Sequence, residues 1–309
     1  MAYRNSTNKI VVICGPTGSG KTAVAIDLAR RFGGEIVGAD SMQIYRYMDI
    51  GTAKPTPAEQ AAAPHHMIDI VDPDEDFDAA AYAKMATEVI YGIIDRGGLP
   101  MVVGGTGFYI KALTHGLFEQ GPLDPDVRRR LKQKANSSGS AGLYRRLQQV
   151  DRASADRIHP NDTYRIIRAL EVFAVTAESL TVYQQRHGFR EKVFEPLEIG
   201  LSWPREVLYD RINRRVDLMI SAGFMEEVRQ LLARGYHRDL KSMQSLGYRH
   251  LAAVIDGEAD LAEMVEKLKR DHRRYAKRQL TWFRAQAAAH WFSPGEIEPV
   301  DGLIMDFIG

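Results

Sequence analysis

The chain has a single cysteine, Cys14, among its 309 residues. One cysteine excludes an intrachain disulfide framework and fits a reducing compartment, so we expect a cytoplasmic protein. No apolar run approaches the ~20 residues of a membrane-spanning helix, and residues 1–9 lack the apolar stretch of a signal peptide. We therefore expect no membrane partner, and we expect the protein to act as a monomer. Cys14 falls in a predicted strand, which favours a small buried apolar residue over a nucleophile.

Metal-ligating residues are also sparse. His65 and His66 are adjacent, but no Cys or further His follows at the spacing of a zinc site, so we expect no zinc. No internal repeat of 20 to 50 residues is present. The length allows one or two domains, and 45% hydrophobic with 26% charged residues is typical of a soluble globular protein.

The net charge of +1 is unevenly distributed. Between Lys267 and Arg284 there are eight Lys or Arg against one Asp, a local charge of +7. From Gly116 to Phe194 fourteen basic residues face nine acidic ones, which gives +5. Two basic segments on a nearly neutral chain indicate a polyanionic partner, although solvated helix faces would give the same counts.

The most informative segment is a glycine-rich turn, Gly15-Pro16-Thr17-Gly18-Ser19-Gly20-Lys21-Thr22. It follows the apolar run 10–14 and precedes helical spacing over 23–29, which is the strand–turn–helix context of a phosphate-binding P-loop. The pattern arises by chance in about one random chain of this length in a hundred. Its backbone N–H groups and helix N-terminus would point at a di- or triphosphate. The lysine adds a positive charge, and the Thr22 hydroxyl can reach a Mg²⁺ ion that the phosphates hold.

Apolar strand candidates alternate with helical patterns along the chain. We predict strands over 10–14, 35–39, 67–71, 99–103 and 196–202, and a helix over 77–95. This alternation predicts an α/β fold, a parallel sheet with helices on both faces. We therefore place a P-loop α/β core in residues 1–117 and 195–309.

The alternation stops between about 118 and 194, which we predict to be a helical insertion domain. Helical patterns cover 126–134, 141–150 and 162–177, with a loop at 136–140. After the insertion we expect helices over 205–222 and 225–234, closed by Gly223 and Gly235, and a long helix over 260–289.

Ligands of parallel sheets bind at the carboxyl ends of the strands, so the residues after each strand are candidates. Asp40 follows one strand and could be a Mg²⁺ ligand, a general base or a turn aspartate. Thr106 follows another in a glycine-flanked turn, and could bind a reacting group or cap a helix. We expect both to share one cleft with the P-loop.

Later arginines and aromatics carry more ambiguous signals. Arg211 and Arg215 share a helix face and could hold a diphosphate or face solvent. Arg168 has the same ambiguity, because Glu171 could pair with it within one helix. In the segment 277–284, cations alternate with Trp and Phe, which suits phosphate contacts with base stacking or a helix with an aromatic core.

A set of motifs in this order over nearly the whole chain resembles the bacterial tRNA dimethylallyltransferase family. The motifs are residues 15–22, Asp40-Ser41-Met42-Gln43-Ile44-Tyr45, 48–55, Gly104-Gly105-Thr106, 158–162, Arg168-Ala169-Leu170-Glu171, Gly247-Tyr248-Arg249 and 277–284. Gly18 departs from the pattern, since many relatives carry Ala there. The zinc finger that eukaryotic relatives append is absent from this sequence.

The resemblance implies transfer of a dimethylallyl group from dimethylallyl diphosphate to N6 of adenine 37, in the anticodon stem-loop of tRNA. The P-loop would then hold a diphosphate leaving group, with Mg²⁺ on Thr22 and Arg211 as a further diphosphate contact. The implied catalytic residues are Asp40 as the general base, Thr106 on the target nucleotide, and Arg215 assisting the diphosphate. The implied tRNA contacts are Asp40, Ser41, Met42, Gln43, Thr106, Arg128, Tyr164, Arg165, Ile166, Ile167, Arg168, Gly247, Tyr248, Arg249, Lys277, Arg278, Gln279, Leu280, Thr281, Trp282, Phe283 and Arg284.

Two other functions would use the same P-loop. A small-molecule or nucleotide kinase that uses ATP would explain Lys21, Thr22 and Asp40, but not the basic insertion or the basic-aromatic helix. A nucleic-acid-binding NTPase without transferase activity would explain the basic segments.

Overall fold

The computed structural model of the protein describes residues 8–116, 124–187, 193–286 and 289–309. The chain forms two compact units, one of Met1–Thr114 with Val193–Gly309 and one of His115–Lys192. The predicted insertion, 118–194, has bounds close to those of the second unit, although its first residue lies outside the described part of the chain.

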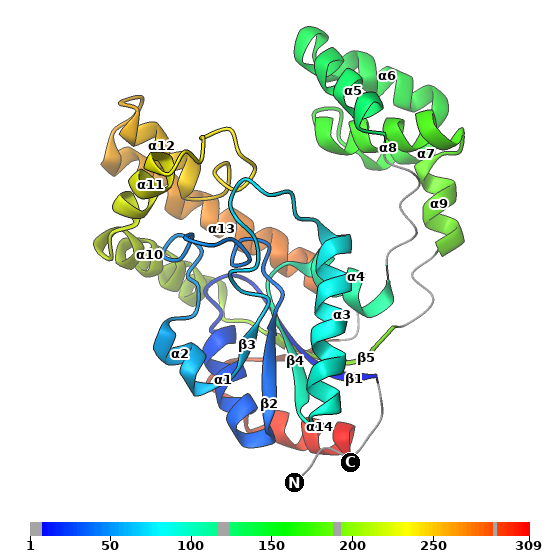
Figure 1. Ribbon diagram of the computed structural model, residues 1–309. Helices are drawn as coiled ribbons and strands as arrows, with labels where there is room; N and C mark the ends of the chain where they lie inside the picture. The colour runs from blue at the N-terminus through cyan, green and yellow to red at the C-terminus, as the bar shows by residue number, and fades with distance from the viewer. Residues whose placement is uncertain (1–7, 117–123, 188–192, 287–288) are drawn as a thin grey trace. The chain divides into compact units, whose positions relative to one another are not determined.

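A sheet of six parallel strands, counted over the described residues, forms the centre of the larger unit (Figure 1). Its order is β3-β2-β4-β1-β5-β6. The strands are β1 (Lys9–Cys14), β2 (Gly34–Gly38), β3 (His65–His66), β4 (Leu99–Gly104), β5 (Glu195–Leu201) and β6 (His290–Phe292). The all-parallel sheet confirms the predicted fold class. β1 is central because residues 10–14 are buried on both faces between β4 and β5, as continuous apolar strands of parallel sheets are.

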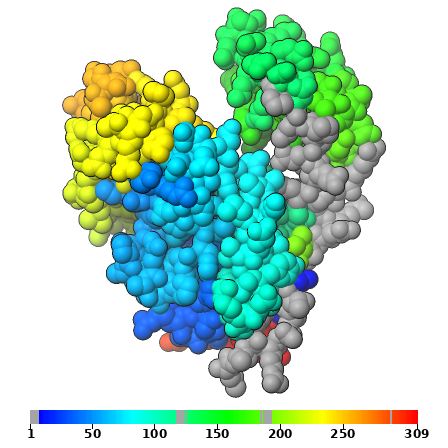
Figure 2. Space-filling view, viewed as in Figure 1, coloured from blue at the N-terminus to red at the C-terminus, as the bar shows by residue number. Residues whose placement is uncertain are grey.

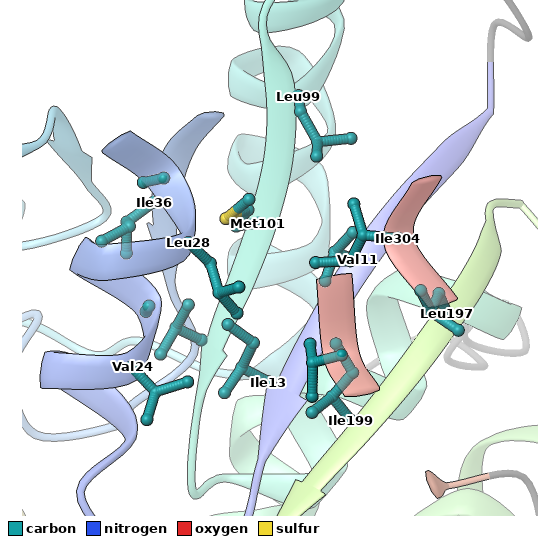
Figure 3. Close-up of a cluster of buried hydrophobic side chains, with 14 of the residues drawn as sticks. Val11, Ile13, Val24, Leu28, Ile36, Leu99, Met101, Leu197, Ile199 and Ile304 are labelled. Carbon is teal, nitrogen blue, oxygen red and sulfur yellow. The ribbon is translucent and has the colours of Figure 1, made fainter. Parts of the chain in front are cut away.

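Helices cover both faces of the sheet. On one face, Val24 and Leu28 of α1 (Lys21–Phe32) pack over Ile13 and Met101 (Figure 3). In the same cluster, α14 (Glu298–Ile308) contributes Ile304. On the opposite face lie α3 (Ala79–Asp95) and α4 (Gly107–His115), joined by stacking of the Tyr82 and Tyr109 rings, whose centroids are 4.3 Å apart. Cys14 is buried, and burial raises the pKa of its thiol to about 12, which confirms the apolar interpretation.

The strand predicted over 67–71 is wrong. This segment makes only an isolated bridge, between Tyr45 and Val71, and the paired strand is the short β3 just before it. Met67 and Asp69 have φ of 63° and 55°, which breaks an extended run. The apolar residues are buried by the loop that follows β2, whose Ile44 carbonyl accepts from Ile70 N at 2.8 Å.

The helices between β5 and β6 pack at the carboxyl edge of the sheet (Figure 1). Here α10 (Arg205–Ser221) and α11 (Phe224–Ala233) confirm the predicted helices, and Gly223 and Gly235 have φ of 98° and 91° at their ends. The predicted long helix is α13 (Leu261–Ala285), which ends before the predicted residue 289. The helices of this unit that were not predicted include α2 (Pro57–Ala62), α12 (Tyr248–Ile255) and α14.

The smaller unit is helical throughout its described residues. It comprises α5 (Pro125–Ser138), α6 (Ser140–Val150), α7 (Arg152–Arg157), α8 (Thr163–Thr176) and α9 (Leu180–His187). The predicted loop at 136–140 is wrong, because α5 continues to Ser138 and only Gly139 separates it from α6. Leu131, Leu143 and Leu147 form a core with α8, and this packing outweighs the loop-like composition.

The chain leaves and rejoins the larger unit at adjoining backbone positions. The carbonyl of Thr114 accepts a hydrogen bond from Val193 N at 2.9 Å. The sheet therefore continues into β5 next to the point where α4 ends.

Candidate active site

The P-loop wraps tightly between β1 and α1. Gly15 has φ of 146°, and a Cβ at this position would lie 2.3 Å from the Leu201 carbonyl oxygen, so only glycine fits. Gly20 has φ of 95° and begins α1 without a side-chain cap. The ammonium of Lys21 folds back and donates to the Pro16 carbonyl at 2.8 Å. The first-turn N–H groups of α1 therefore lack a side-chain cap, which is the arrangement that binds anions.

A cavity of about 580 Å³ opens beside this loop, at the carboxyl edge of the sheet. It brings together three predicted segments, the P-loop, the residues after β2 and the turn after β4, with Arg215 of α10. The predicted site residues that line it are Thr17, Gly18, Gly20, Lys21, Thr22, Asp40, Ser41, Met42, Gln43, Arg215, Tyr248, Arg249, Arg278 and Gln279. The rule that ligands bind beyond the carboxyl ends of parallel strands located this cavity correctly.

Lys21, Arg215 and Asp40 are three of the charged residues in the cavity wall. Burial and, to a smaller extent, the nearby Arg215 together lower the pKa of Lys21 to about 8, against the opposing effect of Asp40. Burial likewise lowers the pKa of Arg215, again opposed by Asp40. The Arg215 Nε atom is buried and has no hydrogen-bond partner among the described residues. These partly dehydrated cations are poised to gain from an anionic ligand.

Asp40 is a turn residue that also borders the cavity. Its Oδ1 accepts from Met42 N at 2.9 Å and Gln43 N at 3.4 Å, so it is a turn aspartate. It also lines the cavity, where its carboxylate faces the charges of Lys21 and Arg215.

Thr106 links the two loops that border the cavity. Its Oγ1 accepts from Ser41 N at 3.0 Å, and the hydroxyl lies 3.3 Å from the Ser41 hydroxyl. The residues before it in the turn, Gly104 and Gly105, line the cavity, but Thr106 is not among the lining residues. In this structure Thr106 therefore holds the turn after β4 against the residues after β2.

Arg211 lies outside the cavity lining. Its Nε donates to the Gly18 carbonyl at 2.9 Å, and its guanidinium lies over the Trp203 ring at 5.2 Å. It therefore braces the P-loop from its exposed side, whereas Arg215, four residues later, reaches the interior.

Sequence reasoning missed Glu227, which organises the loop of the 48–55 motif. From α11, its carboxylate accepts from the backbone N–H groups of Asp49, Ile50 and Gly51 at 2.9, 2.7 and 3.1 Å. The Tyr248 hydroxyl donates to it at 2.7 Å. Figure 2 shows the loop (blue) lying against the segment that follows α11 (yellow). No local pattern marks this contact, because 176 residues separate Glu227 from Gly51.

The predicted RNA segment 277–284 divides between two environments. Lys277, Arg278, Thr281, Trp282 and Arg284 are exposed. Phe283 is buried, as the alternative of an aromatic core requires, but the exposed Trp282 contradicts that alternative. Gln279 is also buried, and Leu280 is half-buried. Elsewhere in this unit, Arg249 is exposed beside Asp271, with 3.4 Å between guanidinium and carboxylate, and Gly247, with φ of 92°, precedes the buried Tyr248.

The smaller unit presents its own mixture of exposed and buried candidates. Tyr164 is 65% exposed, and the Arg128 guanidinium lies 5.5 Å from its ring centroid. Arg165 is exposed and pairs with Asp162. Arg168 pairs with the buried Glu171 at 3.0 Å, as the intrahelical alternative predicts. Ile166 and Ile167 belong to the core of this unit.

Metal-ligating clusters and membrane-spanning helices are both absent from the described part of the chain. The described residues contain no group of three or more His, Cys, Asp or Glu side chains that could hold a metal ion. Within the same residues, no helix is long and apolar enough to cross a membrane.

The sheet order, the glycine-rich turn and the cavity define a P-loop α/β protein. Residues 43–286 match the family described as IPP transferase, and residues 8–75 match the isopentenyl transferase family. A tRNA dimethylallyltransferase of Desulfosudis oleivorans is 54% identical over 97% of this chain and 96% of its own length. The chain therefore belongs to the IPP transferase family, and curated relatives that share about half of its residues are named tRNA dimethylallyltransferase.

Solved structures agree with this assignment. The tRNA isopentenylpyrophosphate transferase of Bacillus halodurans superposes with a TM-score of 0.72 at 42% identity, over 97% of both chains. A eukaryotic dimethylallyltransferase acting on tRNA gives a TM-score of 0.80 at 26% identity, over 97% of this chain and 80% of that one. These likenesses confirm the resemblance found in the motifs, and they favour a transferase over a kinase.

Proposed function

We propose that the protein transfers the dimethylallyl group of dimethylallyl diphosphate to N6 of adenine 37 in tRNA and releases diphosphate. The observation that carries this proposal is one cavity in which a carboxylate, Asp40, faces two partly dehydrated cations, Lys21 and Arg215. The family assignment supports the same chemistry. A proton acceptor and an anion cradle are the two groups that alkylation of an exocyclic amine needs.

The leaving group is the first requirement of the reaction. The bond between the allylic carbon C1 and the diphosphate oxygen breaks, and its electron pair leaves with the diphosphate. P-loop N–H groups, the Lys21 ammonium and the Arg215 guanidinium stabilise this growing negative charge. One preorganised donor of this kind contributes roughly 2.7–4 kcal/mol. The buried Nε of Arg215, which lacks a partner among the described residues, gains one when the diphosphate binds.

The nucleophile is the second requirement. The N6 lone pair of adenine is delocalised into the ring, so the amine attacks C1 only if its proton leaves as the N–C bond forms. The Asp40 carboxylate accepts that proton. Because Oδ1 is fixed by two backbone N–H groups, the second oxygen is the proton acceptor. General base catalysis of this kind contributes roughly 10²–10⁴ in rate.

The residues fit a magnesium ion held mainly by its ligand. Thr22, the last residue of the P-loop motif, lines the cavity and offers a hydroxyl oxygen. Mg²⁺ binds proteins through one or two such oxygens together with phosphates and water. When bound, the ion would add positive charge at the diphosphate.

The tRNA contacts that we propose are exposed or half-buried members of the predicted set, taken for each unit by itself. In the larger unit these are Arg249 and the cationic and aromatic side chains of α13, and in the smaller unit the Tyr164 and Arg128 pair with Arg165. Cations bind the phosphates and position the RNA, whereas an extruded base is selected in the cavity. Stacking on an exposed aromatic ring suits the unpaired bases of a loop.

One experiment separates this function from the kinase and NTPase alternatives. The protein is incubated with dimethylallyl diphosphate labelled in its allyl group and unmodified tRNA, and in parallel with labelled ATP. We expect label in the RNA, located at adenine 37 by digestion, with negligible ATP turnover. ATP hydrolysis or phosphoryl transfer without labelled RNA would refute the proposal.

A further inference from the structure

The side chain of Gln279 connects two loops that border the active-site cavity. It lies on α13 and is only 7% exposed. Its Oε1 accepts from Thr17 N of the P-loop at 2.8 Å, and its Nε2 donates to the Gly105 carbonyl at 2.9 Å. Thus a single amide spans from the phosphate-binding loop to the turn that carries Thr106.

Both ends of this contact demand the chemistry of an amide. Thr17 N requires an acceptor and the Gly105 carbonyl requires a donor, and a carboxylate supplies only the first. The partner loop is also shaped for it, because a Cβ at Gly105 would lie 2.3 Å from Gln279 Nε2. The amide can reach the turn only because residue 105 has no side chain.

The burial of Gln279 distinguishes it from the neighbouring residues of α13 that we propose as tRNA contacts. Lys277, Arg278 and Thr281 on the same helix are exposed, whereas the Gln279 side chain is buried with both ends of its amide bonded. The assignment of the whole segment 277–284 to tRNA contact therefore does not suit this residue.

We propose that Gln279 is a positioning residue, which fixes the P-loop relative to the turn before Thr106 and does not contact tRNA. This inference rests on the proposed function, since those loops would hold the diphosphate and border the target base. Misplacement of reacting groups by about 1 Å can cost roughly 10² in rate. Loss of the amide should therefore impair use of the donor while leaving affinity for RNA intact.

The test uses Gln279→Met, which keeps the length of the side chain but removes both hydrogen bonds. Gln279→Glu keeps an acceptor for Thr17 N and removes the donor to the Gly105 carbonyl. This variant still tests the link between the two loops if the Met variant unfolds. The matched control is Gln230→Met, the same change at an exposed glutamine on α11. Each protein is assayed for kcat and KM of dimethylallyl diphosphate at saturating tRNA, and for tRNA Kd by filter binding. The stoichiometry of tRNA binding gives the folded fraction.

We expect kcat/KM for the donor to fall at least tenfold in the Gln279 variants, with tRNA Kd within twofold of the parent protein and no change in the control. A raised tRNA Kd with normal donor kinetics would overturn the inference and make Gln279 an RNA contact. Unchanged values of both would overturn it as well.

Binding of inorganic diphosphate, measured by calorimetry, keeps this test independent of the transfer assay. If the parent protein transfers no dimethylallyl group, the proposed function fails. The positioning role is then decided by whether Gln279→Met weakens diphosphate binding at least fivefold, and equal affinity would refute it.

Discussion

Replacement of Asp40 by Asn separates its contacts within the turn from the general-base role that we propose for it. Asn keeps an oxygen at the position of Oδ1, which can still accept from Met42 N and Gln43 N, so the turn should persist. What it loses is a basic oxygen for the N6 proton. We expect the transfer rate to fall by roughly 10²–10⁴, which is about 2.7–5.5 kcal/mol of transition-state stabilisation.

Electrostatics gives the same variant a second, opposite effect. Asp40 is an anion that interacts with Lys21 and Arg215, so its neutralisation removes a competitor of the diphosphate for those cations. Binding of inorganic diphosphate should therefore become tighter while turnover falls. tRNA Kd should stay within severalfold, because one neutralised carboxylate alters few phosphate contacts.

The assay is a rapid-quench single turnover with labelled dimethylallyl diphosphate and saturating enzyme, which isolates chemistry from product release. Asp40→Ala provides the comparison, because it removes the turn as well as the base. A rate for Asp40→Asn within threefold of the parent would refute the assignment of Asp40 as the base. Loss of diphosphate binding would show instead that the residue acts only by shaping the loop.

Three further predictions test the surroundings of the site. Glu227→Ala should lower the free energy of unfolding by at least about 2 kcal/mol, because it leaves the backbone N–H groups of residues 49–51 without their acceptor. Calorimetry should show that Tm falls by several degrees, and an equal fall in the exposed control Glu226→Ala would contradict the role of Glu227 in holding this loop. Lys277→Ala combined with Arg278→Ala should weaken tRNA binding and reduce the slope of log Kd against log salt by roughly two; an unchanged slope would place this face in solvent. Because the pKa of Lys21 is lowered to about 8, its ammonium is present below that pH and lost above it, so the KM for dimethylallyl diphosphate should rise as the pH passes 8. Lys21→Arg should flatten this rise. A KM that stays constant from pH 7 to 9.5 would argue against a charged lysine at the diphosphate.

The sequence predicts this protein best where chemistry and chain direction coincide. The eight residues of the P-loop motif contain its glycines and its lysine, and a helical pattern follows them directly. The sequence signal is therefore local. Asp40 and the glycines before Thr106 follow apolar strands, and parallel strands all end at one edge. Their meeting in a single cavity with the P-loop therefore follows from the strand pattern alone.

Contacts between distant segments could not be predicted in this way. Glu227 has the spacing of an ordinary surface glutamate on α11, and Gln279 lies among RNA-like residues, yet each organises a loop far away in sequence. The same limit explains two errors in secondary structure. Residues 67–71 are apolar because a loop buries them, and the Ser-rich end of α5 is helical because its apolar face packs against α8.

The adjoining backbone positions of Thr114 and Val193 give the helical unit an unusual freedom. An insertion whose two ends are joined by one hydrogen bond imposes no strain on the neighbouring strands. Its length and composition can therefore change while the active-site cavity is preserved. The whole insertion could be replaced by a different nucleic-acid-binding domain, and Thr114 and Val193 mark the positions at which such a domain should be joined.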